Sequence, residues 1–237
     1  MERLRRGAET IGINLGVAQI DQFQIYLEKL VEWNSSINLT SAGALEDAET
    51  THFLDSLTVS LGIPSGMLES GRFVDVGSGA GFPGVPLKIA FPGLRPSLVE
   101  ATAKKTAFLT LLLAYLGLSD VEIWTERSET LAQNPRLRES FDFAVVRAVG
   151  GVATLAELTL PFCRIGGVAV IQKGPEIGDE LDEGRRAIEV VGGFVKEVRQ
   201  VEVGGPDRTA TLLVLEKASP TPPQYPRRPG VPERRPL

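Results

Sequence analysis

A short apolar segment that carries an acid and runs into a glycine-rich turn is the part of this sequence best suited to bind a ligand. Residues 72–76 read as a strand with Asp75 near its end, and Gly77, Gly79 and Gly81 follow at alternate positions. Glycine lacks a Cβ atom, so the chain can turn sharply and present its N–H groups to a bound molecule. Because a carboxylate at the strand end favours a positive charge, this arrangement indicates the amino or sulfonium group of S-adenosylmethionine.

The same turn matches a second ligand-binding pattern. Residues 79–84 read G-x-G-x-x-G, the dinucleotide fingerprint, and Glu100 follows at about the spacing of its ribose-binding acid. An NAD-dependent enzyme is therefore an alternative. Two features argue against it, since the first glycine after the strand is Gly77 and the charge of Asp75 would oppose a pyrophosphate. A tight structural turn without a ligand is a further alternative.

Polar side chains also follow the later predicted strands. Parallel strands end at one edge of a sheet, where open α/β sheets bind their ligands. Glu100 would accept hydrogen bonds from ribose hydroxyl groups, and Ser128 or Glu129 would meet the adenine edge. Arg147 and Lys173 would oppose a cationic cofactor, so we expect them to bind an anionic partner, either RNA phosphate groups or the O6 and N7 acceptors of guanine.

Further basic residues extend this predicted RNA-binding surface. Lys104 and Lys105 begin a helix on the same rim of the sheet. Residues 219–237 form a proline-rich tail that contains Arg227 and Arg228. The prolines predict an extended, non-helical tail, which is either solvated and disordered or in contact with RNA.

The elements around these residues predict an α/β fold in three parts. Residues 1–62 read as a helical cap, and residues 63–218 alternate strands with helices, which indicates a doubly wound, mostly parallel sheet. The last two strands, near 194–203 and 209–216, form an antiparallel hairpin. By analogy, a closing hairpin on a seven-stranded sheet of this kind predicts the Rossmann-like class I fold of S-adenosylmethionine-dependent methyltransferases.

Composition limits the classes of protein that fit. The chain has 237 residues, 43% of them hydrophobic, and a net charge of −5, so nucleic-acid binding would need local basic patches. Cys163 is the single cysteine, in an apolar segment that reads as helical, so we expect a buried side chain and no metal site. The sequence contains neither a run of about eighteen apolar residues nor a signal peptide, so we expect a cytoplasmic protein.

His52, the only histidine, precedes Asp55 by about one helical turn. The pair could contact substrate or orient a loop. We favour a structural pair that ties the cap to the core, since such spacing is common on helix surfaces.

A set of motifs spread over the chain carries a resemblance to a known family. The motifs are Trp33-Asn34, Asn38-Leu39-Thr40, His52 with Asp55-Ser56-Leu57, the stretch from Asp75 to Leu87, Lys104-Lys105, Arg147-Ala148, Lys173-Gly174 and the stretch from Tyr225 to Gly230. In these motifs the chain resembles the RsmG family, also called GidB, of bacterial 16S rRNA guanosine-N7 methyltransferases. The cofactor contacts that the resemblance implies fall on Gly77, Phe82, Glu100, Ala101, Thr102, Ser128, Glu129 and Arg147.

The resemblance also implies an activity and a partner. The enzyme would methylate N7 of the guanosine called 527 in the usual rRNA numbering, in 16S rRNA or the small ribosomal subunit, and we expect a monomer that binds neither DNA nor membrane. Guanine N7 carries a free lone pair and loses no proton, so we predict no catalytic acid or base, only positioning by Arg147 and Lys173. A non-catalytic RNA-binding module and a small-molecule methyltransferase remain alternatives.

Overall fold

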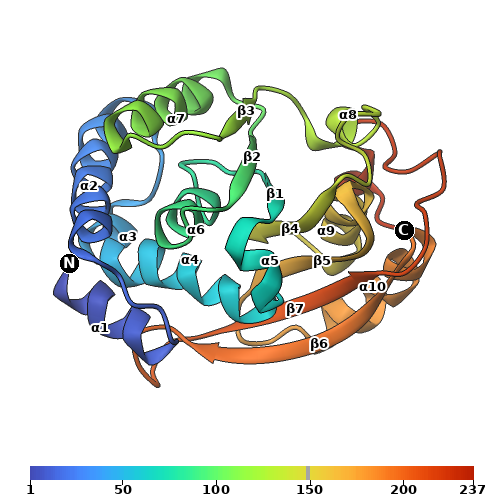
Figure 1. Ribbon diagram of the computed structural model, residues 1–237. Helices are drawn as coiled ribbons and strands as arrows, with labels where there is room; N and C mark the ends of the chain where they lie inside the picture. Colours follow the sequence, from blue (N-terminus) through green and yellow to red (C-terminus); the bar gives the residue numbers. More distant parts are fainter. Residues whose placement is uncertain (148–149) are drawn as a thin grey trace.

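A seven-stranded sheet in the order β3-β2-β1-β4-β5-β7-β6 organises the chain in the computed structural model, which describes residues 1–147 and 150–237 (Figure 1). The strands are β1 (Arg72–Val76), β2 (Arg95–Val99), β3 (Glu122–Trp124), β4 (Phe141–Arg147), β5 (Cys163–Lys173), β6 (Gly193–Glu202) and β7 (Thr209–Lys217). Strands β1 to β5 are parallel, and β7 pairs antiparallel with both β5 and β6. The predicted mostly parallel sheet with a closing hairpin is confirmed.

Helices cover both faces of this sheet. The α-helices are α1 (Glu2–Thr10), α2 (Val17–Ile37), α3 (Ala42–Glu46), α4 (Asp55–Thr58), α5 (Ser65–Ser70), α6 (Gly84–Ala90), α7 (Ala103–Leu116), α8 (Ser128–Leu131), α9 (Val152–Thr159), α10 (Gly178–Val190) and α11 (Val231–Arg234). A π-helical turn, Glu49–Leu54, leads into α4, and 3-10 turns cover Val59–Gly62 and Leu160–Phe162. Among the described residues, no helix has the length and apolarity needed to cross a membrane.

Two hydrophobic clusters lie on opposite faces of the sheet because side chains alternate along each strand. In β1, Phe73 belongs to the cluster shared with the cap, and the next residue, Val74, belongs to the cluster beneath α9 and α10. Fully burying one side chain of this size contributes roughly 1.5–3 kcal/mol relative to leaving it exposed. The alternation therefore fixes which face of the sheet carries the cap.

The N-terminal cap packs directly on the sheet. The buried side chains Phe23, Tyr26 and Leu30 of α2 share one hydrophobic cluster with Phe73 of β1. The Tyr26 hydroxyl donates a hydrogen bond of 2.5 Å to the Ala80 carbonyl in the glycine turn. The cap thus holds the turn that follows β1 from one side.

Two expectations from the sequence are wrong. Cys163 is buried as predicted, but it is the first residue of β5 and does not lie in a helix. The tail contains the short helix α11, although its prolines predicted no helix. A proline in the first turn of a helix costs no hydrogen bond, so Pro232 is compatible with α11.

The tail packs against the core beside α8 and α9 (Figure 1). Arg138 donates hydrogen bonds to the carbonyls of Thr221 (2.7 Å) and Tyr225 (2.8 Å). Lys217, which is fully buried, contacts Thr221 and donates to the Val191 carbonyl at 2.9 Å. These contacts attach the first half of the tail to the sheet and its helices.

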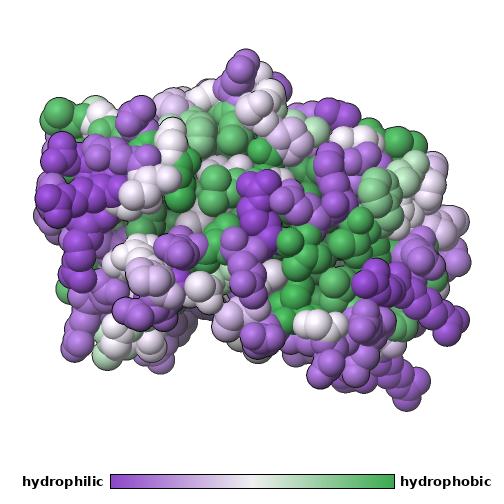
Figure 2. Space-filling model, turned by 90° about the horizontal axis from the view of Figure 1, so that it is seen from below, coloured by the Kyte–Doolittle hydropathy of each residue, from purple (hydrophilic) through white to green (hydrophobic). Residues whose placement is uncertain are grey.

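Strand β6 forms one edge of the sheet. The exposed apolar residues Phe194 and Val198 lie on this strand among charged residues that pair locally, such as Arg199 with Glu197 at 2.7 Å. The view from below, the side on which β6 lies, shows green apolar areas interrupted by purple polar ones (Figure 2). Charges on an edge strand disfavour its pairing with another chain.

Candidate active site

The glycine turn after β1 is held by backbone hydrogen bonds. The N–H groups of Gly77 and Ser78 both donate to the Val99 carbonyl at the end of β2, at 2.9 and 3.0 Å. Gly77 has a φ of 72°, in the left-handed region that favours glycine, and a Cβ atom there would meet no atom within 4 Å. The turn at Gly77 is therefore open on its ligand-facing side.

Gly81 serves a different purpose. A Cβ atom at this position would lie 2.7 Å from the Tyr26 hydroxyl oxygen and 2.8 Å from Val85 Cγ2. Its lack of a side chain lets the cap and α6 approach the turn. The structure thus places Gly81 in the packing beneath the turn and outside the lining of the cavity described below.

Asp75 also lies beneath the turn. Its side chain is fully buried, Oδ2 accepts a hydrogen bond of 2.9 Å from the Gly84 N–H, and Oδ1 has no partner among the described residues. Burial raises the pKa of Asp75 to about 7. Asp75 joins the end of β1 to the start of α6 and does not line the cavity, although the sequence predicted a direct contact with the cofactor.

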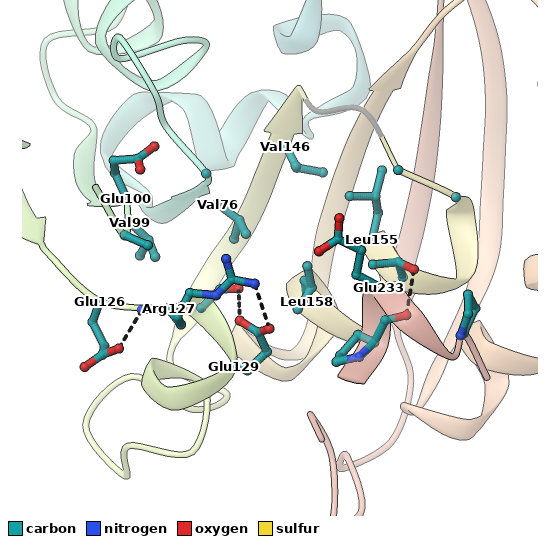
Figure 3. A pocket seen from close by; sticks show the side chains of 18 residues that line it. Val76, Val99, Glu100, Glu126, Arg127, Glu129, Val146, Leu155, Leu158 and Glu233 are labelled. Atoms are coloured by element: carbon teal, nitrogen blue, oxygen red, sulfur yellow. Dashed lines mark hydrogen bonds and ion pairs between the residues drawn. The ribbon is translucent and has the colours of Figure 1, made fainter. Parts of the chain in front are cut away.

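A cavity of about 480 Å³ opens at the carboxyl ends of β1, β2 and β4 (Figure 3). Such a volume lies in the range of small-molecule and cofactor sites. Its apolar lining includes Val76, Val99, Ala101, Val146, Leu155 and Leu158. Its glycine and polar lining includes Gly77, Glu100, Ser128, Glu129, Gly150, Gly151 and Thr154. The cavity lies between β1 and β4, where the strand order reverses, as expected for an open α/β sheet.

Glu100 connects the glycine turn with the start of α7. Its Oε2 accepts from the Gly79 N–H at 3.1 Å and its Oε1 accepts from the Thr102 N–H at 2.7 Å. Each carboxylate oxygen can accept a further hydrogen bond. Glu100 is held in place by two backbone donors and can still accept from hydroxyl groups in the cavity.

Glu129 and Ser128 both line the cavity, and Figure 3 shows Glu129 beside Arg127. Burial raises the pKa of Glu129, but hydrogen bonds from the Gly230 N–H (2.7 Å) and Arg127 (3.2 Å) outweigh it, so the pKa falls below its usual value. Ser128 Oγ lies 3.3 Å from Glu129 Oε2. The carboxylate is thus charged and already engaged by the tail.

The charge of this cavity suits a cation. Four carboxylates, those of Glu100, Glu126, Glu129 and Glu233, line it against the single cation Arg127 among its described residues. A cationic sulfonium compound with an aromatic base and ribose hydroxyl groups fits these acceptors and the apolar wall. A dinucleotide pyrophosphate would meet a negative field.

A second cavity, of about 430 Å³, lies at the ends of β4 and β5 and carries the opposite charge. Three cations, Arg147, Lys173 and Arg208, line it with one acid, Asp55. Lys173 Nζ donates to the Gly150 carbonyl at 2.7 Å, and Gly150 lines the first cavity. The acidic and the basic cavity therefore meet at the end of β4.

Arg147 is oriented by the cap. Its guanidinium group donates to Asp55 Oδ2 (2.9 Å) and to the Thr51 carbonyl (3.2 Å), and it lies 4.9 Å from the centre of the Phe82 ring. The His52 ring stacks on Phe82 at 4.6 Å and 12°. Arg147 Nη2 also lies 3.3 Å from His52 Nδ1, so His52 and Asp55 are joined through Arg147 and not as the direct pair that we favoured.

Comparison with known proteins decides the family. The model of the GidB family, rRNA small subunit methyltransferase G, matches residues 19–210. A ribosomal RNA small subunit methyltransferase G of Dehalococcoides mccartyi is 46% identical over 237 residues, all of both chains. That of Roseiflexus castenholzii is 45% identical over 240 residues, again all of both chains. The chain belongs to the rRNA small subunit methyltransferase G family.

Solved structures show the same fold at low identity. M. jannaschii TYW2 in complex with AdoMet has a TM-score of 0.54 at 16% identity, and the match covers 75% of this chain and 78% of that one. A 16S rRNA (adenine(1408)-N(1))-methyltransferase variant from Catenulisporales acidiphilia has a TM-score of 0.51 at 17% identity, covering 70% of this chain and 93% of that one. The predicted class I methyltransferase fold is confirmed.

In this member of the methyltransferase G family, some of the residues predicted to contact cofactor line the acidic cavity and the others lie around it. Gly77, Glu100, Ala101, Ser128 and Glu129 line the acidic cavity. The others lie around it: Asp75, Gly79, Gly81 and Phe82 belong to the turn and its support, Thr102 precedes α7, and Arg147 lines the basic cavity.

Of the residues predicted to contact RNA, two line the basic cavity and the others lie elsewhere. Arg147 and Lys173 share the basic cavity, whereas Lys104 and Lys105 lie at the start of α7 outside both cavities. Arg228 is exposed on the tail. Arg227 is bound to Glu157, whose carboxylate is fully buried, with Nη2 2.6 Å from Oε2. Its guanidinium group is therefore already paired inside the protein.

Sequence reasoning missed three parts of the two cavities. Arg208 comes from the loop before β7, and Leu155 and Leu158 of the apolar wall come from α9. Pro232, Glu233 and Pro236 of the tail also line the acidic cavity. The proline–arginine composition of the tail was the only signal there, and it pointed to solvent or RNA.

Proposed function

We propose that this protein transfers the methyl group of S-adenosylmethionine to N7 of a guanosine in 16S rRNA. The observation that carries this proposal is the pair of adjoining cavities of opposite charge at the end of β4, one acidic and one basic. The acidic cavity suits a cationic methyl donor and the basic cavity suits an anionic nucleic acid. The names of the relatives, ribosomal RNA small subunit methyltransferase G, support the same substrate class.

The acidic cavity would hold the cofactor. The open backbone at Gly77 would face it, Glu100 would accept from ribose hydroxyl groups, and the apolar wall of Val99, Val146 and Leu155 would pack on the adenine ring. The complex of M. jannaschii TYW2 with AdoMet supports this cofactor for the fold. When bound, S-adenosylmethionine supplies an electrophilic methyl group next to the basic cavity.

The basic cavity would hold the target nucleotide. Arg147, Lys173 and Arg208 can pair with phosphate oxygens or donate to the O6 acceptor of guanine. Guanine N7 needs no deprotonation, so the residues at the junction have only to align the acceptor with the donor. The fixed geometry of Arg147, which is oriented by Asp55 and Thr51, serves that alignment.

The proposal also covers where the enzyme acts and its oligomeric state. We place the reaction on 16S rRNA within or bound for the small ribosomal subunit, and therefore in the cytoplasm. We also infer a monomeric enzyme whose cap, residues 1–62, supports a methyltransferase core over residues 63–218.

Calorimetric titration and rRNA mapping test the function together. We expect the purified protein to bind S-adenosylmethionine and not NAD, and to restore N7-methylguanosine in 16S rRNA from a strain that lacks the modification. Glu100→Ala should weaken cofactor binding, whereas Lys173→Ala should retain it and lose methylation. Binding of NAD alone would contradict the cofactor assignment. Cofactor binding without any new N7-methylguanosine would contradict the substrate.

A further inference from the structure

The last eleven residues, 227–237, form a segment that we call the C-terminal strap. It begins at a buried ion pair between Arg227 and Glu157 of α9. Arg227 Nε lies 2.9 Å from Oε1 of Glu157, and the Arg227 backbone N–H donates to the same oxygen at 2.8 Å. Because Glu157 is fully buried, breaking this pair would leave an uncompensated charge, so the start of the strap is firmly attached.

The strap is then attached to both helices at the rim of the acidic cavity. The Gly230 N–H donates to Glu129 of α8 at 2.7 Å. Thr154 of α9 donates to the Pro232 carbonyl at 3.0 Å through its hydroxyl group. Glu129 and Thr154 themselves line the acidic cavity, so these bonds hold the strap across its edge.

Three strap residues complete the lining of the cavity. Pro232 and Pro236 add apolar surface, and Glu233 adds a carboxylate. Figure 3 shows the Glu233 side chain across the cavity from Glu100, and no hydrogen bond or ion pair of its carboxylate is found within residues 1–147 and 150–237. A carboxylate in this place is free to accept from a bound ligand.

We propose that the C-terminal strap is a wall of the cofactor site, and that Glu233 presents an acceptor to a donor group of the bound nucleoside cofactor. This inference rests on the proposed function, since the ligand class is the same cationic sulfonium nucleoside. The strap acts in two ways. It covers apolar surface of the ligand, and its carboxylate makes the field of the cavity more negative.

Calorimetry with S-adenosylmethionine on four forms of the protein tests this inference. They are the full chain, a chain that ends at Arg228, the variant Glu233→Gln and the control Arg235→Ala. Ending at Arg228 keeps the buried Arg227–Glu157 pair and removes the cavity wall. Arg235 is exposed on the same strap and does not line the cavity, so its replacement should leave the affinity unchanged.

We expect the chain that ends at Arg228 to bind S-adenosylmethionine at least about tenfold more weakly, because cofactor sites bury most of their ligand. Glu233→Gln should weaken binding by roughly threefold, since the carboxylate is largely exposed. Thermal unfolding without ligand shows whether the shortened chain is folded. If it is not, the test rests on Glu233→Gln and on Thr154→Val, which removes the bond to Pro232 and keeps a side chain of similar volume in the cavity lining.

Limited proteolysis gives an independent measurement on the intact chain. Trypsin can cleave after Arg234 in the strap and after Arg5 in α1. We expect S-adenosylmethionine to slow cleavage after Arg234 and to leave cleavage after Arg5 unchanged. Affinity equal to that of the full chain in both the shortened chain and Glu233→Gln would overturn the strap's role alone. No binding by the full chain would overturn the proposed function together with it.

Discussion

Arg147 Nη1 lies 2.9 Å from Oδ2 of Asp55, which joins the last residue of β4 to the first residue of α4. The second guanidinium nitrogen, Nη2, lies 3.3 Å from His52 Nδ1. The cap therefore fixes the orientation of a cation that lines the basic cavity. The cap thus contacts the end of β4 in addition to covering one face of the sheet.

Arg147→Lys tests this positioning. Lysine keeps the charge but cannot reach Asp55, Thr51 and His52 at once, because only the guanidinium group is a planar fork of donors. We expect the kcat/KM for rRNA methylation to fall by roughly 10- to 100-fold, the loss of a charged hydrogen bond or two, and the affinity for S-adenosylmethionine to stay within about twofold. Kinetics and calorimetry measure the two quantities. An equal loss in kcat/KM and in the affinity for S-adenosylmethionine would show that Arg147 belongs to the cofactor site. Arg185→Ala, on the exposed face of α10, is the control.

Two substitutions of Asp75 distinguish a contribution of its charge to cofactor binding from a contribution of its hydrogen bond to the glycine turn. Asp75→Asn keeps an oxygen that can accept the Gly84 N–H, so we expect S-adenosylmethionine binding to remain. Asp75→Ala removes that acceptor and should weaken binding by at least about tenfold. Calorimetry on both variants decides the matter. If Asp75→Asn loses as much affinity as Asp75→Ala, the charge of the carboxylate is what the cofactor needs.

The raised pKa of Asp75 also predicts a pH effect on stability. Its pKa of about 7 lies above the value of 3.8 for an unfolded chain, so between pH 4 and 7 the folded state binds more protons. This group therefore stabilises the fold at low pH, and its contribution is lost as the pH rises through that window. Urea unfolding should show Asp75→Asn gaining stability relative to the wild type as the pH rises from 4 to 7. If the difference in the free energy of unfolding between the two proteins does not change with pH, the pKa of Asp75 is not raised.

His52 has the opposite pH dependence. Burial, together with the charges of Arg147 and Arg208, lowers its pKa to about 4. The unfolded chain then binds more protons between pH 4 and 6.5, so the fold loses stability as the pH falls through that window, by up to about 3 kcal/mol for this group. Urea unfolding at several pH values should show the advantage of the wild type over His52→Gln shrinking below pH 6.5. An advantage that does not change with pH would show that His52 titrates normally.

Arg227 is predicted to support the fold and not to bind RNA. Arg227→Ala leaves the buried Glu157 carboxylate without its partner and should destabilise the protein by about 3–5 kcal/mol. Replacing both residues with methionine should recover most of that loss, because a buried ion pair and an apolar pair are often similar in stability. Denaturant unfolding measures the three proteins. A loss below about 1 kcal/mol in Arg227→Ala would contradict this assignment.

The sequence by itself determined the fold and the edge of the sheet where the site lies. The glycine turn after β1 and the polar residues after the later strands could be placed together because parallel strands end at one edge. Glu100, Ser128 and Glu129 line one cavity for this reason, and Arg147 and Lys173 line another. Alternating apolar strands and periodic helices leave few other topologies for such a chain.

Only the tertiary structure decided which side of the turn each residue faces and where the tail runs. Asp75 and Gly81 belong to the same motif as Gly77, yet they point into the packing beneath it, because α6 and Tyr26 occupy that side. The strap is held by hydrogen bonds between residues that are far apart in the sequence. Arg227 and Glu157 are separated by 70 positions, and Gly230 and Glu129 by 101. No local pattern encodes such contacts, since they form only after the sheet has brought α8 and α9 to the same edge.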